Sequence, residues 1–322
     1  MTAETIDRAE TSIAQSWTQK NRSKLPAYVG TVVLLGVAGF ISKDLLTARS
    51  LIAILTLSTL YSVLGLGQGI VLLTGGIDLS IPALMTFAAV ALTSISKGAN
   101  DCLVWLIPLI LCASALVGSV SGFFVAVVRV SPIVVTLGMN AIVTGLLLIS
   151  VNGTPRGNTP SAISFLMNGR VLQTFPPILL IVAVCYVVFL IMLFKTPYGQ
   201  RIYAVGSSER VAYLTGINVK GILVSVYMIN AVMAAVAGMM LAGYSTLSYV
   251  GMGDPYLLPS LAVVIVGGGS ILGGKGDPIG TLGGALMITF LSTDLSAMLV
   301  PSGVRSVFFG VVILLAVAIS KE

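Results

Sequence analysis

Long apolar stretches, separated by short polar segments, follow one another along almost the whole chain. Cutting the sequence at its polar and charged clusters leaves about ten stretches that are long enough to cross a membrane as helices. They lie near residues 26–42, 50–73, 80–96, 103–128, 132–151, 176–194, 222–250, 257–273, 279–298 and 303–319. Because the stretches are continuously apolar, without the two-residue alternation of membrane-barrel strands, they predict an all-α fold.

Glycine clusters interrupt two of these stretches. They lie within 50–73 and 257–273, and we expect both spans to be broken there. Irregular backbone at membrane depth is tolerated where protein or a cavity surrounds it, so at least one discontinuous helix is predicted. Small residues spaced four apart, which let membrane helices approach closely, occur at Gly65 and Gly69 and at Gly118 and Gly122.

Composition supports a membrane protein. Of the 322 residues, 57% are hydrophobic and only 9% are charged, and the mean hydropathy is +1.06. A soluble domain of this size needs many more charged residues on its surface. We therefore expect a polytopic membrane protein with an N-terminal segment, residues 1–25, and a single transmembrane domain, residues 26–322.

The distribution of lysine and arginine predicts the orientation. With the N-terminus inside, most of the 17 basic residues lie on the cytoplasmic side, so both termini are expected there. The first 25 residues carry charges and no apolar run, which excludes a cleavable signal peptide. They form an interfacial helix, with Ile6, Ile13 and Trp17 on one face, or an unstructured tail.

The chain lacks the residues that most catalytic mechanisms require. The chain has no histidine and no metalloprotease or serine-hydrolase motif, so we expect no enzyme and no cofactor in this chain. The stretch GSILGGKG, residues 269–276, ends in Gly276 where a phosphate-binding loop needs Ser or Thr, which indicates a glycine-rich loop. The basic residues are scattered over loops and predict no nucleic-acid surface. Packing in apolar surroundings, without a disulfide or metal, is expected for Cys102, Cys112 and Cys185.

Few ionisable residues lie within the apolar stretches. Asp78 and Asp294 lie near span boundaries, and no basic partner is evident inside a span. Proton-coupled carriers usually hold several ionisable groups inside the membrane. A transporter of this composition must therefore couple to an ion held by backbone and hydroxyl groups, or to another protein.

The longest polar stretch on the expected cytoplasmic side is residues 195–222. Within it, 208–214 predicts a short helix that begins with a Ser208 cap and ends at Gly216. A short capped helix in a loop suits the docking of a partner. The alternative is an ordinary basic loop, since Glu209 faces four basic residues, Lys195, Arg201, Arg210 and Lys220.

This stretch reads YAVGSSERVAYLTGIN from Tyr203 to Asn218, and two further motifs accompany it, GGIDLS at 75–80 and AVVIVGGGS at 262–270 followed by GGKG at 273–276. In these motifs the chain resembles the permeases of the ribose- and monosaccharide-type ABC importers over most of residues 50–319. Arg210 stands where the family usually has a second acid, and Ile81-Pro82-Ala83 replaces the usual Val-Gly-Ser.

The resemblance implies a permease subunit in the bacterial inner membrane that takes up a sugar or sugar-like polyol. It also implies an ABC-type ATPase that binds ATP, a second permease subunit, identical or a related paralogue, and a periplasmic substrate-binding protein. The helix that couples to the ATPase would span 207–216, with Ser208, Glu209, Arg210, Val211, Ala212, Tyr213, Leu214 and Gly216. An ion-coupled secondary transporter or a passive polyol channel is the alternative function.

Polar residues inside the spans are candidates for the translocation path or for a discontinuous helix. Uncharged amides suit the passage of a polyol, but they equally form hydrogen bonds between helices. Asp78 precedes a helix start, where its carboxylate would accept backbone N–H groups; a contact with sugar or a gate is the other possibility. The candidates are Gln68, Gly75, Gly76, Asp78, Ser80, Asn140, Asn230, Gly267 and Gly268. A possible inverted repeat relates residues 50–151 to 222–319.

Overall fold

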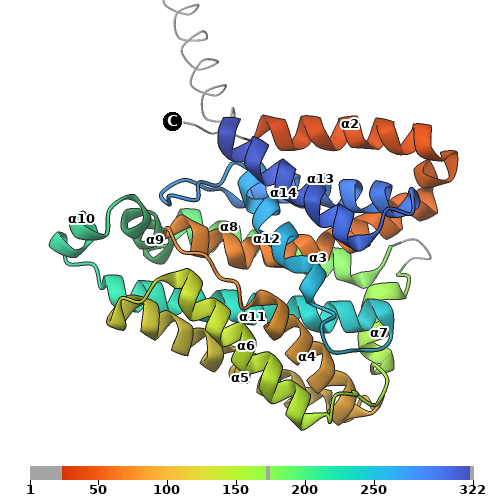
Figure 1. The fold of residues 1–322 in the computed structure, drawn as a ribbon, viewed down its shortest axis with the longest axis horizontal. Coiled ribbons are helices and arrows are strands. Elements are labelled where there is room, and N and C mark those ends of the chain that lie inside the picture. Colours follow the sequence, from red (N-terminus) through yellow and green to blue (C-terminus); the bar gives the residue numbers. More distant parts are fainter. Residues whose placement is uncertain (1–23, 172–174, 320–322) are drawn as a thin grey trace, which may run out of the picture.

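The computed structural model describes residues 24–171 and 175–319, and helices make up its regular structure (Figure 1). The described part of the chain contains no strand beyond an isolated bridge between Val171 and Phe175. The proposed face of Ile6, Ile13 and Trp17 lies outside the described residues. The helices are α2 (Leu25–Ile41), η1 (Lys43–Leu46), α3 (Ala48–Leu73), α4 (Ile81–Ser96), α5 (Leu103–Phe123) with the π-helical turn η2 (Phe124–Val128), α6 (Pro132–Ser150), α7 (Ser161–Asn168), α8 (Pro177–Lys195), α9 (Pro197–Ser207), α10 (Glu209–Leu214), α11 (Val219–Ser245), η3 (Asp254–Tyr256), α12 (Leu257–Val266), α13 (Pro278–Ala297) and α14 (Ser302–Ile319).

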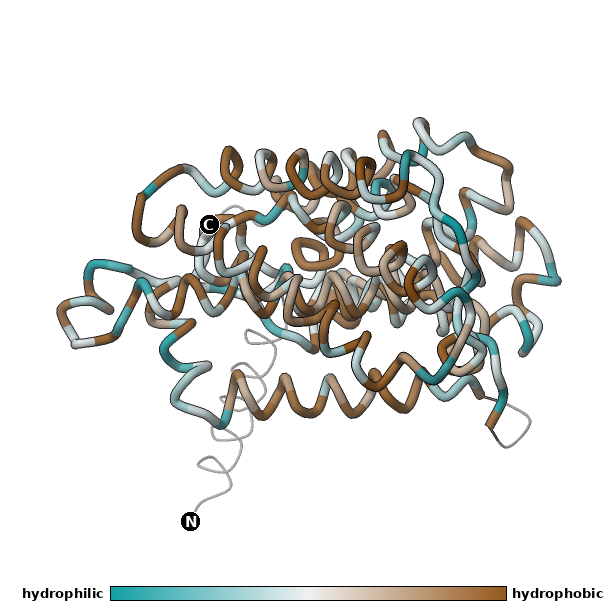
Figure 2. Tube along the Cα trace, turned by 90° about the horizontal axis from the view of Figure 1, so that it is seen from below, coloured by the Kyte–Doolittle hydropathy of each residue, from teal (hydrophilic) through white to brown (hydrophobic). Residues whose placement is uncertain are grey.

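The all-α polytopic membrane fold is confirmed. Among the described residues, six helices are long and apolar enough to cross a membrane, and four shorter apolar helices accompany them. Together they occupy the ten predicted stretches. The helices between the two ends of the molecule are predominantly hydrophobic, whereas hydrophilic segments gather at the ends (Figure 2).

Helices α3 and α11 form the centre of the bundle. α11 packs against α3, α4 and α5, and α3 also contacts α12 and α13. Their side chains are mostly buried, whereas α5, α6, α8 and α14 expose many large apolar side chains. Apolar surface on the outside of a bundle is what lipid or another membrane subunit covers.

The predicted break within 50–73 is wrong, because α3 is continuous from Ala48 to Leu73. Its glycines serve close packing instead. A Cβ atom on Gly65 would lie 2.6 Å from side-chain carbons of Val263 and Thr281. The expected close contact at Gly118 is confirmed, since a Cβ there would lie 2.5 Å from the carbonyl oxygen of Tyr227 on α11.

Two breaks do interrupt the apolar helices. The first follows α3, where Gly75 has φ +75 and regular helix resumes at Ile81. The second follows α12, which ends at Val266, so the predicted span to residue 273 was too long. Gly268 has φ +90, a conformation that glycine adopts without strain and that ends the helix.

The polar segments define two ends of the molecule. Helices α9 and α10 lie at one end of the long axis, called here the α10 end, and α7 lies at the opposite end, the α7 end (Figure 1). Residues 50–151 contain α3 to α6, and α11 to α14 occupy the second proposed unit. Their relation by an inverted repeat stays a prediction.

Candidate functional site

The polar stretch after α8 folds into two short helices joined at Ser208. Ser208 has an extended backbone, with φ −166, and its hydroxyl accepts the Val211 N–H at 3.3 Å, which caps α10. Gly216 follows the helix with φ +83. The predicted capped helix is therefore confirmed as local structure. Helix α9 was missed, although Thr196 followed by Pro197 is a typical helix start.

Helix α10 presents an apolar face that no other described part of the chain covers. Val211, Tyr213 and Leu214 are 59%, 72% and 75% exposed. Ala212 is buried and fixes the opposite side of the helix to the protein. Three large apolar side chains on a polar end of the molecule form a patch suited to a protein partner.

An ion pair fastens α10 to the turn between α5 and α6. Nη1 of Arg129 lies 2.6 Å from Oε2 of Glu209. Arg129 follows the π-helical turn in a left-handed conformation, with φ +65. The sequence did not predict this pair, because nothing in the spacing relates two residues 80 positions apart.

Backbone atoms of α9 meet both breaks. Gly206 lies directly against the carbonyl group of Leu73 at the end of α3 and against the amide of Gly274. The Gly274 N–H donates to the Leu73 carbonyl oxygen at 2.9 Å. Gly273, with φ +87, lies between Gly75 and Gly206. We call this meeting of three segments the glycine junction; at Gly206 it leaves no room for a side chain.

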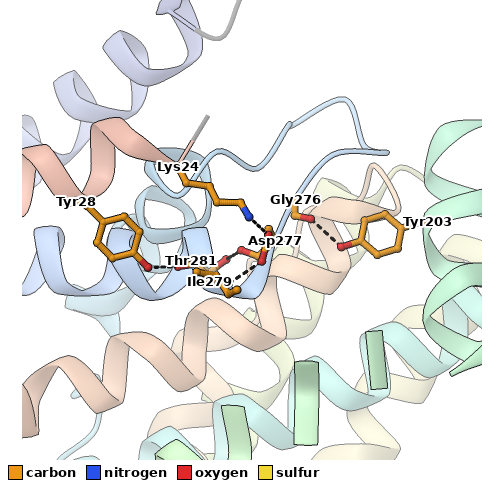
Figure 3. A network of polar contacts seen from close by, with 7 residues as sticks. All are labelled: Lys24, Tyr28, Tyr203, Gly276, Asp277, Ile279 and Thr281. Atoms are coloured by element: carbon orange, nitrogen blue, oxygen red, sulfur yellow. Dashed lines mark hydrogen bonds and ion pairs between the residues drawn. The ribbon is translucent and has the colours of Figure 1, made fainter. Parts of the chain in front are cut away.

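Side-chain bonds surround the glycine-rich loop, as Figure 3 shows. The Tyr203 hydroxyl on α9 donates to the Gly276 carbonyl oxygen at 2.8 Å. Lys24, just before α2, forms an ion pair with Asp277, whose Oδ1 accepts the Ile279 N–H at 2.8 Å and caps α13. Burial and, second, the charge of Asp277 raise the pKa of Tyr203 to about 12, so its hydroxyl stays a donor at neutral pH.

Replacing Tyr203 with phenylalanine is expected to loosen this loop. The change removes the bond to Gly276 and costs about 1 kcal/mol. Hydrogen exchange should therefore rise at the Gly274 amide, which is bonded inside the glycine junction. Tyr213→Phe is the matched control because Tyr213 is 72% exposed. Equal exchange in both variants would show that Tyr203 does not hold the loop.

Asp78 is completely buried at the first break, and its hydrogen-bond partners among the described residues are all neutral groups. Its Oδ1 accepts the Ser80 N–H at 2.8 Å and the Ser80 hydroxyl at 2.6 Å. Its Oδ2 accepts Nδ2 of Asn230, on α11, at 2.7 Å. The expected bond to a backbone N–H at a helix start is present. Ser80 makes no cap of its own, because its hydroxyl is turned to Asp78.

The three predicted amides lie in different surroundings. Asn140 on α6 accepts the Ala83 N–H at 3.2 Å, in the first turn of α4. Asn140 and Asn230 therefore both join segments that are distant in the sequence. Gln68 is fully buried, and neither of its amide atoms has a hydrogen-bond partner among the described residues. Polar groups of this kind are rare in folded proteins and often mark sites of function.

The other candidate residues divide between the two breaks. Gly76 lies against the Tyr227 hydroxyl, where a Cβ would be 2.5 Å from the oxygen. Gly267 lies against Gly280, with 2.5 Å between a Cβ and the carbonyl oxygen. Gly268 supplies the left-handed turn after α12. Seven of the nine candidates therefore form two groups, which the glycine junction connects: Gly75, Gly76, Asp78, Ser80 and Asn230 at the first break, and Gly267 and Gly268 at the α12 break.

A cavity of about 290 Å³ lies between the first break and α10. Its wall includes Gly75 and Gly76 on one side and the Arg129–Glu209 pair on the other. Tyr227 also lines it, and the hydroxyl of this tyrosine is buried without a partner among the described residues. A space of this size, with an unpaired hydroxyl in its wall, is a candidate site for a small solute.

Comparison with known proteins shows which family the chain belongs to. The family described as "Branched-chain amino acid transport system / permease component" matches residues 50–317, from the start of α3 into α14. The chain belongs to this permease family. The match includes both breaks, the glycine junction and the α9–α10 segment.

Several curated permeases are similar to the chain. The ribose import permease of Escherichia coli K12 is 31% identical over 100% of this chain and 99% of its own length. The fructose import permease of Rhizobium meliloti is 28% identical, covering 95% and 87%. The permease of an autoinducer 2 import system from Photorhabdus temperata is 29% identical, covering 77% and 75%. No solved structure gives a significant match.

Proposed function

We propose that this permease is the transmembrane subunit of a bacterial ABC importer that takes up a sugar or sugar-like polyol. The exposed apolar face of α10 carries the proposal, because it is a preformed docking surface on a capped helix at one end of the bundle. Similarity to ribose and fructose import permeases over most of the chain supports the solute class. A separate ATPase would supply the driving force.

The proposal assigns a side of the membrane to each end. With both termini in the cytoplasm, the α10 end faces the ATPase and the α7 end faces the periplasm. The substrate-binding protein would then meet the loop 152–175, which contains α7. Residues 26–322 act as one permease domain beside a second permease subunit, and residues 1–25 lie in the cytoplasm. ATP binds to the partner ATPase alone.

Movement of the ATPase would reach the breaks through two direct contacts. The first is the glycine junction, where α9 touches the end of α3 and the loop before α13. The second is the Arg129–Glu209 ion pair, which joins α10 to the turn between α5 and α6 and lines the same cavity as Gly75 and Gly76 at the first break. Packed backbones transmit displacement because they cannot deform independently. A shift of α10 would therefore move both discontinuous regions and switch the access of the path.

Leu214→Glu is expected to prevent assembly with the ATPase. A charge in the middle of an apolar docking face should weaken retention at least about tenfold, as for other central interface residues. The chain is co-expressed with each ABC-type ATPase of its own cell, and retention is measured after solubilisation. The matched control is Leu299→Glu, because Leu299 is 89% exposed and follows α13 away from the α10 end.

Retention of the ATPase by the control and not by Leu214→Glu would support the coupling surface. If neither variant nor the intact chain ever retains an ATPase, the energy source lies elsewhere. Accumulation of solute by the purified chain in liposomes under an ion gradient alone would then establish the alternative, an ion-coupled carrier.

A further inference from the structure

The segment that includes α9 and α10 is basic. Between residues 195 and 222, Glu209 is the one acidic residue among four basic ones, Lys195, Arg201, Arg210 and Lys220. Arg201, Arg210 and Lys220 are exposed. A partner that approaches α10 therefore meets a positive surface potential.

The single acid of this segment is already paired within the chain. Glu209 bonds Arg129 at 2.6 Å, and Arg129 comes from outside the segment. Glu209 is thus balanced by a guanidinium that faces it from the α5–α6 turn. Within the described part of the chain none of the four basic residues of the segment forms an ion pair, and Arg210 and Lys220 are the two that lie beside the docking face of α10.

A groove beside α10 gathers these charges. It has a volume of about 470 Å³ and lies next to the apolar face of the helix. Ile217 and Val219 contribute apolar side chains to its lining, and Arg129, Arg210 and Lys220 contribute basic groups. The lining residues are Arg129, Glu209, Arg210, Tyr213, Ile217, Asn218, Val219 and Lys220.

We propose that α10 and this groove bind an acidic site on the ATPase, and this inference rests on the proposed function. The site would consist of an apolar socket for Val211, Tyr213 and Leu214, with a carboxylate side chain at its rim. That carboxylate enters the groove and meets Arg210 and Lys220. Arginine and lysine both pair well with a carboxylate, and arginine can form two parallel hydrogen bonds with it.

Two observations favour a protein over an anionic lipid as the occupant. Helix α10 is the outermost element at its end of the long axis, beyond the ends of α5 and α11 (Figure 1). The groove is also continuous with the three exposed apolar side chains, since Tyr213 belongs to both surfaces. A lipid headgroup would use the positive charges and leave the apolar face in water.

The test measures equilibrium binding of the ATPase selected by co-purification to the full chain in neutral phosphatidylcholine nanodiscs. Arg210→Glu is expected to weaken binding about tenfold or more, and Arg210→Lys to retain most of it. Binding to the intact chain should weaken as salt is raised from about 50 mM to about 500 mM, because ions screen exposed charges. Arg49→Glu, an equal charge change at an exposed position in the first turn of α3, should bind normally.

Folding does not confound the variant. Position 210 is exposed in the first turn of α10, where a negative side chain is favourable for the helix. If Arg210→Glu binds the ATPase normally while Leu214→Glu still loses it, the acidic site on the ATPase is overturned. The proposed function would then still stand. If Arg210→Glu weakens ATPase binding only in nanodiscs that contain phosphatidylglycerol, the groove binds lipid, and the proposed acidic site on the ATPase is also overturned. Failure of every form to bind an ATPase would count against the proposed function itself.

Discussion

Gly206→Ala is expected to remove most of the stably folded permease. A single Cβ at this position would overlap the Leu73 carbonyl group and would lie 3.0 Å from the Gly274 nitrogen. Both neighbours are backbone, so no rotamer change can relieve the overlap. Displacing them breaks the 2.9 Å bond from Gly274 to Leu73. Overpacking costs about 1–3 kcal/mol, and the lost hydrogen bond adds about 1 kcal/mol.

The measurement is the unfolding temperature of the purified protein and the fraction that elutes as a single species. Gly138→Ala on α6 is the control, because a Cβ at that position would meet no described atom within 4 Å outside the adjacent residues and the backbone of its own helix. In a helix this change is neutral or stabilising. Normal stability and transport in Gly206→Ala would show that α9 moves independently of the two breaks, and the proposed transmission through the glycine junction would be wrong.

Local signals explain what the sequence predicted well. The ten apolar stretches are recognisable because each must cover itself with lipid or protein along its whole length. The Ser208 cap and the Gly216 stop are recognisable because one residue type performs each task within a single turn. Predictions of this kind depend on neighbours in the chain and need no knowledge of the fold.

Glycine was harder to interpret from sequence. The same residue permits a left-handed turn, as at Gly268, and a close contact within a straight helix, as at Gly65. The choice depends on whether another helix approaches. For this reason the break expected inside α3 was wrong. The break at the glycines that follow α12 was correct, although the predicted span ended at residue 273 and the helix ends at Val266.

Contacts between distant segments were not predictable. Asp78 was expected to accept backbone N–H groups, but its bond to Asn230 joins residues 152 positions apart. The Arg129–Glu209 pair spans 80 positions. Composition indicates only that such polar groups need partners inside a membrane protein. Which partners they find is decided by the packing of α11 against α3, α4 and α5.

Asp78→Leu is expected to be as damaging as the change at Gly206. Leucine leaves the Ser80 N–H and Nδ2 of Asn230 buried without acceptors. Each such group costs about 1–3 kcal/mol, so the folded permease should lose roughly 3 kcal/mol or more and little of it should reach the membrane. Asp101→Leu, at an exposed position before α5, should be nearly neutral.

Asp78→Asn separates hydrogen bonding from charge. Its amide oxygen can still accept both bonds from Ser80, and its Nδ2 can donate to Asn230 once that amide turns over. The Asn230 amide can rotate in this way because its Oδ1 has no hydrogen-bond partner among the described residues that the rotation would break. We therefore expect normal yield and unfolding temperature, because all three present bonds come from neutral groups. Loss of folded protein in Asp78→Asn would make the ionised charge itself structural, and a stable variant without uptake would place Asp78 on the solute path.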